Sequence, residues 1–407
     1  MDLLNVIRSS AGNRKDDDAT DRLNHIYTSM LLILFAVVVT TKQYVGEPIE
    51  CWCPAQFTGN YIRYTSNICW VKNTYYISMD EMVPETNSLK DKPQLRYYQW
   101  MPFILLGLAL FYQLPCLFWR ANNESSGMNL DNIINISIQY IDAGNMDTKD
   151  NCVKMLTKHF DRYLEMRKRW NRPNTRRVDF VKEIMRAACV CTGRKYGNYI
   201  TLLYVTTKSM YLLNTVAQFI LIDMLLSNGV VNGYGIRLVQ NFINGESFKG
   251  SYYFPRITLC DFNVREMGYE VIGHRYTVQC VLSINLFSEA IFAFYWFWLI
   301  MAVCFNAFSL CKWVWYSLFK SDSINYIRKH IRDELIDEGD MYSTLRDFVL
   351  NYLRSDGVFA MRLISHNSTD IVVTDLVSAM YENFKIRKSA LEPSDTGVPY
   401  EKNILLN

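Results

Sequence analysis

Four apolar stretches limit what this chain of 407 residues can fold into. They are Ile26–Val45, Met101–Trp119, Tyr199–Leu226 and Val281–Leu310. A helix needs about 20 mostly apolar residues to cross the hydrocarbon core of a bilayer, and these stretches meet that length. The third is the most polar, because it carries Lys208, Asn214, Gln218 and Asp223. Long charged segments separate the four, so the sequence predicts a membrane protein with several spans.

The distribution of basic residues predicts which side of the membrane each segment faces. Lys and Arg gather at one set of span ends, at Arg14, Lys15 and Arg22, at Arg120, at Arg194 and Lys195, and at Lys312 and Lys320. Basic residues collect on the cytoplasmic side, and an even number of spans leaves both termini there. No secretory signal peptide is recognised at the N-terminus. The net charge of +3 is too small to imply a nucleic-acid partner.

Cysteines mark the two predicted outer loops. Cys51, Cys53 and Cys69 lie in the first loop, and Cys260 and Cys280 lie in the second. Paired cysteines in an oxidising compartment favour disulfides. Zinc is the rival interpretation, but the spacing fits no structural zinc pattern. Four cysteines allow three pairings, so the pattern alone leaves the connectivity open.

A short aromatic segment, Tyr97-Tyr98-Gln99-Trp100-Met101-Pro102-Phe103, begins the second span. Tyr and Trp are enriched where a helix meets lipid headgroups, with the ring buried and the OH or NH wet. Proline is tolerated in the first turn of a helix. We therefore interpret Tyr97, Tyr98, Gln99, Trp100 and Pro102 as an interface anchor. Pro115 predicts a kink within this span, which is either a hinge or static shape.

Several of these segments resemble the innexins, the invertebrate gap-junction proteins. The resemblance rests on Tyr97–Phe103, on Pro48-Ile49-x-Cys51-Trp52-x-Pro54-x-x-Phe57-Thr58, on Cys69-Trp70-Val71-x-Asn73-Thr74-Tyr75, and on the segments Tyr253–Arg265 and Thr277–Asn285. It implies an all-α membrane protein: a four-transmembrane-helix bundle with disulfide-stapled extracellular loops and a helical cytoplasmic domain. It also implies the crosswise disulfides Cys51–Cys280 and Cys69–Cys260. Cys53 departs from the family pattern and is expected to be a free thiol.

The N-terminal segment Met1–Gly12 has a helical pattern with Leu3, Leu4 and Ile7 on one face. Such a helix either lies on the membrane or folds into a pore. The innexin resemblance favours the pore, whose expected lining is Met1, Asp2, Leu3, Asn5 and Val6. A ring of Asp2 carboxylates would favour cations.

The resulting domain plan has ten segments. They are 1–25, N-terminal pore arm and linker; 26–45, first span; 46–100, extracellular loop 1; 101–119, second span; 120–198, cytoplasmic loop; 199–226, third span; 227–280, extracellular loop 2; 281–310, fourth span; 311–387, cytoplasmic helical region; and 388–407, disordered tail. Arg14–Asp18 is expected to be a solvated linker, and Ser355–Phe359 a turn. Helices are expected over Cys152–Trp170, Asn325–Leu335 and Met341–Leu353. The basic run Arg167–Arg177 is by default a solvated face, and it could attract anionic lipid.

Polar residues of the third span fall at alternating spacings of three and four, so they share one helical face. They are Thr201, Tyr204, Lys208, Tyr211, Thr215 and Gln218. Such residues face partners or water rather than lipid. Packing within a bundle is favoured over pore lining. Glu289 in the fourth span should likewise have a partner.

The sequence favours a channel over an enzyme. The five histidines are scattered, and no phosphate-binding or dinucleotide loop is present, so no catalytic site, cofactor or metal is expected. The resemblance implies a gap-junction channel subunit at the plasma membrane. Its expected partners are other innexin subunits in an octamer, a docked hemichannel of the adjacent cell, and membrane lipids. The alternatives are an undocked, pannexin-like release channel and a four-span adhesion scaffold.

Overall fold

The computed structural model describes residues 16–77, 94–124, 127–170, 197–227, 235, 239–240, 243–244, 254–264, 274–332 and 341–390. The chain divides into two compact units. One, the span unit, comprises Thr20–Cys116 and Lys208–Ser309. The other, the helical unit, comprises Met1–Ala19, Leu117–Thr207 and Leu310–Asn407.

The first span begins earlier than predicted. Helices α2 (Ala19–Arg22), η1 (Leu23–Thr28) and α3 (Ser29–Tyr44) follow one another without a break, so the helix starts seven residues before Ile26. The segment η1 is a π-helix, in which the hydroxyl of Thr28 donates to the carbonyl of Leu23, five residues back. Wider turns of this kind are often found at functional sites.

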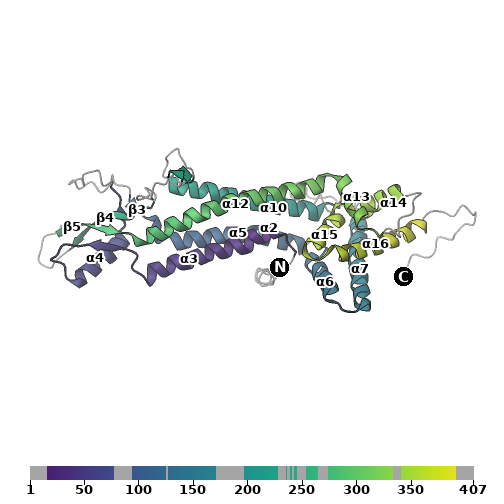
Figure 1. Ribbon diagram of the computed structural model, residues 1–407, viewed down its shortest axis with the longest axis horizontal. Coiled ribbons are helices and arrows are strands. Elements are labelled where there is room, and N and C mark those ends of the chain that lie inside the picture. Colours follow the sequence, from purple (N-terminus) through teal and green to yellow (C-terminus); the bar gives the residue numbers. More distant parts are fainter. Residues whose placement is uncertain are drawn as a thin grey trace, which may run out of the picture. The chain divides into compact units, whose positions relative to one another are not determined.

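Three further long helices carry the remaining apolar stretches. They are α5 (Met101–Glu124), α10 (Tyr199–Ser227) and α12 (Ser283–Leu318). In the span unit, α3, α5, α10 and α12 run side by side (Figure 1). Within the described part of the chain, three helices are long and apolar enough to cross a membrane: Ala19–Tyr44, Met101–Asn123 and Ser283–Leu318. The more polar α10 falls outside that group, so its crossing of the membrane stays a prediction.

A five-stranded antiparallel sheet, which the sequence analysis did not predict, joins the two loops that carry the cysteines. Its order is β1 (Glu50–Trp52), β5 (His274–Val281), β4 (Ile257–Val264), β2 (Thr74–Tyr75) and β3 (Gln94–Leu95). Helix α4 (Gly59–Lys72) packs on this sheet. It ends at Lys72, and the next residue, Asn73, has a φ of 75° and a ψ of 159°, a backbone conformation that residues other than glycine rarely adopt. We call these five strands and α4 the stapled sheet.

The helical unit is built around one apolar core. Its further elements are α6 (Leu130–Asp142), α7 (Met146–Trp170), α13 (Lys320–Lys329), α14 (Met341–Asp347), η5 (Phe348–Leu353), α15 (Arg354–Asn367) and α16 (Asp370–Ser389). The side chain of Asn129 caps α6 by accepting from the backbone of Asn132. Asp370 lies in the first turn of α16 and Arg387 in the last, which suits the helix dipole.

Two local predictions in the helical unit are wrong. Ser355–Phe359 is not a turn but part of α15; the chain changes direction one residue earlier, at Arg354, whose φ is 56°. Helix α16 extends through Ser389, so Lys388 and Ser389 belong to a helix and not to the tail.

The acidic run before the first span is anchored rather than solvated. Asp16 and Asp17 are buried. The indole of Trp119 donates to the Asp16 carboxylate at 3.2 Å, and the indole of Trp313 donates to Asp18 at 3.3 Å. The prediction of a solvated linker is therefore wrong over Asp16–Asp18, because buried indoles of the helical unit donate to the carboxylates of Asp16 and Asp18.

Candidate functional site

Two disulfides tie the loop after the first span to the loop before the fourth. Cys51 of β1 is bonded to Cys280 of β5, its direct partner in the strand register. Cys69 of α4 is bonded to Cys260 of β4. This is the crosswise arrangement that the resemblance implies. Each disulfide closes a loop of about two hundred residues, and a crosslink of that kind typically adds ~2–4 kcal/mol to stability by restricting the unfolded chain.

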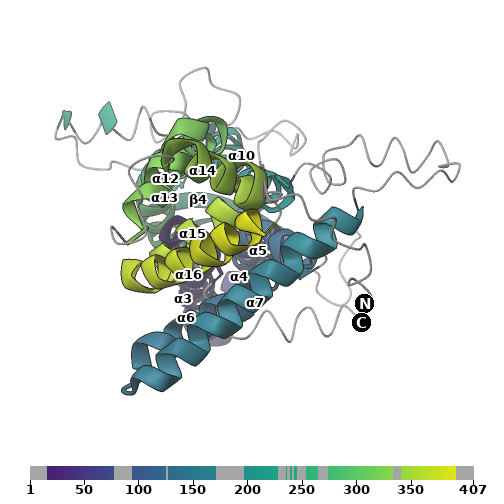
Figure 2. The ribbon, with the colours of Figure 1, turned by 90° about the vertical axis from the view of Figure 1, so that its right-hand side faces the viewer.

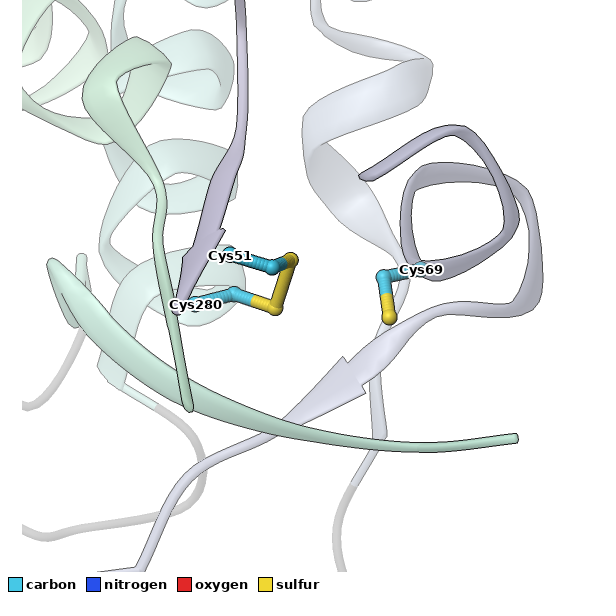
Figure 3. A group of neighbouring side chains, drawn as sticks. All are labelled: Cys51, Cys69 and Cys280. Atoms are coloured by element: carbon cyan, nitrogen blue, oxygen red, sulfur yellow. A yellow bond between two sulfur atoms is a disulfide. The ribbon is translucent and has the colours of Figure 1, made fainter. Parts of the chain in front are cut away.

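The sulfur atoms of the two disulfides lie close together. Those of Cys51, Cys69 and Cys280 are all within 4.8 Å of one another (Figure 3). Because these sulfurs are already bonded in disulfides, they are not free thiolates for a zinc ion. Cys53 is a free, half-buried thiol whose Sγ donates to the carbonyl of Cys51 at 3.6 Å.

A buried carboxylate next to Cys260 reinforces the stapled sheet. Asp261 of β4 accepts from Arg275 of β5 at 2.8 Å and from the hydroxyl of Tyr75 of β2 at 2.9 Å. Burial alone would raise the pKa of Asp261. Hydrogen bonds from Thr277, Arg275 and Tyr75, together with the charge of Arg275, outweigh burial and lower that pKa below its usual 3.8. The ionised carboxylate thus links three strands drawn from both loops.

The aromatic segment at the start of α5 connects this sheet to the helices. Tyr98 is fully buried, with its ring 4.8 Å from that of Trp70. Its carbonyl accepts from Gln43 of α3 at 2.7 Å, and Gln99 donates to the carbonyl of Trp70 at 2.5 Å. Burial raises the pKa of Tyr98 to about 12.

The interface-anchor prediction therefore needs correction for Tyr98, because α4 covers the ring that was expected to lie among headgroups. Tyr97 packs in the same way against Phe254, with ring centroids 5.7 Å apart. Trp100 is 62% exposed and Phe103 is 61% exposed, so these two aromatic residues of the segment remain available to an interface. Pro102 lies in the first turn of α5, as the sequence predicts.

Glu289, which the sequence analysis expected to have a partner, is paired. Its carboxylate lies 3.1 Å from the guanidinium of Arg256, just before β4. The amide of Asn285, one turn earlier on α12, donates to the carbonyl of Pro255 at 2.7 Å. These contacts fix the start of α12 against the strand that carries Cys260.

The polar face of α10 is buried, so the prediction of packing rather than pore lining is confirmed. All six of its residues are at most 5% exposed: Thr201, Tyr204, Lys208, Tyr211, Thr215 and Gln218. The ammonium of Lys208 lies 2.9 Å from the carboxylate of Asp21 in α2. Removing one partner of a buried ion pair typically costs ~3–5 kcal/mol, because the remaining charge stays desolvated.

Amide and hydroxyl groups continue this contact along the helices of the span unit. Asn24 in the π-helix and Asn306 in α12 exchange hydrogen bonds at 2.7 and 3.0 Å, and Asn306 also donates to Thr215. Further along, the hydroxyl of Tyr295 donates to Gln218 at 2.5 Å. We call the set formed by Asp21, Asn24, Lys208, Thr215, Gln218, Tyr295 and Asn306 the polar seam.

A second cluster, in the helical unit, fixes the start of α10. Asp356 of α15 is fully buried, and its carboxylate accepts from the backbone NH groups of Tyr199, Ile200 and Thr201 at 3.1 to 3.2 Å. The hydroxyl of Tyr163 also donates to it. The first NH groups of a helix have no partner within the helix, and a carboxylate there also meets the positive end of the dipole. Asp356 therefore caps α10 from a distant part of the sequence.

Comparison with known proteins decides the family. A family model described as Innexin matches residues 17–384. The chain is 33% identical over 375 residues to Innexin unc-9 of Caenorhabditis elegans, covering 91% of this chain and 92% of that protein. It is 32% identical to Innexin-19 of Caenorhabditis briggsae, with 93% and 89% covered, and 31% identical to Innexin eat-5 of Caenorhabditis elegans, with 96% and 92% covered.

The chain belongs to the innexin family. Innexins form gap-junction channels, so this innexin is a membrane protein that works as a channel subunit within an oligomer. The features described above give this role a physical basis: two disulfides hold the loops together, and polar contacts hold the helices together.

The site residues expected at the N-terminus are not among the described residues. Met1, Asp2, Leu3, Asn5 and Val6 all precede residue 16, so their pore-lining role in this innexin stays a prediction. Sequence reasoning found the cysteines and the polar face of α10, but it missed Asp356 and Asp261. The sequence analysis placed Asp356 only within the predicted turn Ser355–Phe359.

Proposed function

We propose that this innexin assembles as an octameric ring, and that two rings dock through their stapled sheets across the gap between adjacent cells. Both termini and the helical unit then face the cytoplasm, and four helices cross the membrane, α10 included. The ring passes ions and small molecules between the cytoplasms.

The observation that carries this proposal is the joining of both loops into one sheet by Cys51–Cys280 and Cys69–Cys260. Two rings can dock only if each presents an ordered rim, because ordering long loops at the moment of contact would cost conformational entropy. Disulfides also suit the oxidising exterior of the cell. The excess of basic residues between the second and third spans favours a cytoplasmic position for the helical unit.

The proposal is tested by electrical recording from paired cells that express the protein. In Cys260→Ala, the Cys69 thiol loses its partner, and we expect junctional conductance to fall at least ~10-fold, because the disulfide's few kcal/mol of ordering is lost. Cys53→Ala is the matched control, since it removes a free thiol that directly follows β1, and it should leave conductance within about twofold. Surface labelling confirms that both variants reach the plasma membrane.

The recordings also separate the alternatives. Junctional current that persists unchanged in Cys260→Ala contradicts docking through the stapled sheet. Current across single membranes without any junctional current in the wild type favours an undocked release channel. A protein that reaches the cell surface and carries neither current favours an adhesion scaffold.

The N-terminal arm is proposed to line the pore with Met1, Asp2, Leu3, Asn5 and Val6. A ring of Asp2 carboxylates attracts cations, so Asp2→Asn should lower the preference for cations over anions. The reversal potential in a salt gradient measures this preference. An unchanged reversal potential places Asp2 away from the ion path. Asp18→Asn serves as the control, because it removes one negative charge at a residue that is held by Trp313.

A further inference from the structure

A groove of about 750 Å³ lies between α7 and α16 of the helical unit. These two helices pack against each other (Figure 2). A volume of this size is typical of small-molecule sites. The groove takes no part in the stapled sheet, the polar seam or the Asp356 cap.

Three basic side chains of α7 form one wall of the groove. Lys154, Lys158 and Arg162 are spaced four residues apart, so they lie on one face of the helix. All three are exposed, and within the described part of the chain none of them forms an ion pair. At a rise of 1.5 Å per residue the row extends over roughly 12 Å.

The acids of the groove do not neutralise this row. Asp161 is already paired: its carboxylate lies 2.7 Å from the guanidinium of Arg387, and it accepts a hydrogen bond from Tyr352. Glu382 of α16 is the other lining acid, on the opposite wall, beside the amide of Asn383. Among the described residues, the groove thus offers three unpaired cations against one unpaired carboxylate, that of Glu382.

We propose that this groove binds a small molecule that carries several phosphate groups, either free in the cytosol or as the headgroup of a membrane lipid. A single phosphate would reach one or two of the cations, whereas several phosphates on one ring can meet all three along the row. Lys and Arg form short, charge-assisted hydrogen bonds to phosphate oxygens, and Asn383 adds a neutral donor. Glu382 opposes such a ligand and limits its affinity.

The test uses the full-length protein in detergent and inositol hexakisphosphate as the probe, with binding measured by calorimetry at about physiological ionic strength. The triple variant Lys154→Gln, Lys158→Gln and Arg162→Gln should weaken binding by at least ~10-fold, because it removes three charge-assisted contacts. Glu382→Gln should tighten binding by about two- to fourfold by removing a repulsive charge.

A matched control removes the same charge elsewhere in the helical unit. Lys320, Arg328 and Lys329 are exposed on α13 and do not line the groove, so their replacement by Gln should change the affinity by less than about twofold. Equal affinity in the wild type and the α7 variant overturns the proposal. Equal weakening in both triple variants also overturns it, since binding then follows total charge rather than the groove.

A second arm identifies the source of the phosphates. The protein is placed in lipid nanodiscs with or without phosphatidylinositol bisphosphate, and the soluble probe is titrated again. If the lipid weakens probe binding to the wild type, the groove takes the headgroup of a membrane lipid; if it does not, the ligand is a soluble one. Neither arm uses channel activity, so failure here leaves the proposed junction intact.

Discussion

Individual buried carboxylates carry much of the organisation of this innexin. Asp356 and Asp261 each collect donors from segments far apart in the sequence. A buried carboxylate without donors would be expensive, so each is tied to a particular arrangement of its neighbours. Two predictions about single residues follow from this dependence.

Replacement of Asp356 should destabilise the helical unit. Asp356→Ala leaves the first NH groups of α10 without an acceptor in a buried place, and we expect a loss of at least ~2 kcal/mol in the free energy of unfolding. Asp356→Asn keeps one acceptor oxygen and should lose less. Thermal unfolding of the purified protein measures both, and Asp142→Ala, an exposed acid at the end of α6, is the control. Equal stability of Asp356→Ala and the control would remove the proposed role of the cap.

Acid should weaken the stapled sheet through Asp261. The pKa of this carboxyl is lower in the folded protein than its usual 3.8, so the unfolded chain binds the proton more tightly. The stabilisation is present above about pH 4 and is lost as the pH falls through the folded-state pKa. Wild type and Asp261→Asn should therefore differ in unfolding temperature at neutral pH, and the difference should shrink as the pH falls below 3.8. A difference that does not change with pH contradicts this account.

At the scale of elements, the short segment that begins the second span acts as a joint. Tyr98 is enclosed by α4 and α3, whereas Trp100, two residues later, is mostly exposed. The sequence assigned both residues to the lipid interface because both are aromatic and both precede an apolar run. Burial by α4 distinguishes them, and it depends on a helix that the sequence analysis did not predict.

The two aromatic residues should respond differently to truncation. Tyr98→Ala removes a fully buried ring and should cost ~3–5 kcal/mol in the free energy of unfolding. Trp100→Ala removes a ring that is 62% exposed and should change stability in detergent by less than ~1 kcal/mol. The stability of the two variants is compared through the fraction of protein that stays monodisperse after heating. Similar losses in the two variants would restore the interpretation of both residues as interface anchors.

The long helices could be predicted from the sequence, but the sheet could not. Apolar runs such as Met101–Trp119 are local signals, and α5 contains that run. The strands β1, β2 and β3 are only two or three residues long, too short for a recognisable alternation. Their partners lie far away in the chain, as in the pairing of Tyr75 with Leu259.

The same limit applies to single contacts. Asp356 caps NH groups of residues more than 150 positions earlier, which no local pattern indicates. Asp16–Asp18 look like a solvated linker because a run of acids is usually exposed. The indoles of Trp119 and Trp313, which donate hydrogen bonds to Asp16 and Asp18, are distant in sequence. The crosswise disulfides could be expected only through the family resemblance.

At the scale of the whole molecule, the chain separates the tasks that a junction subunit needs. In the span unit, disulfides and Asp261 hold the stapled sheet, and the polar seam holds α2, α10 and α12 to one another. In the helical unit, the Asp356 cap and the groove between α7 and α16 lie on separate sets of residues. Rim, bundle and groove can therefore be altered one at a time by the variants described above.

Particle images of the purified full-length protein test the central claim most directly. We expect rings with eightfold rotational symmetry, of which a fraction pair end to end through the stapled sheets, and we expect the pairs, but not the rings, to be lost in Cys260→Ala. Monomers, or rings that pair through the helical unit, would contradict the account.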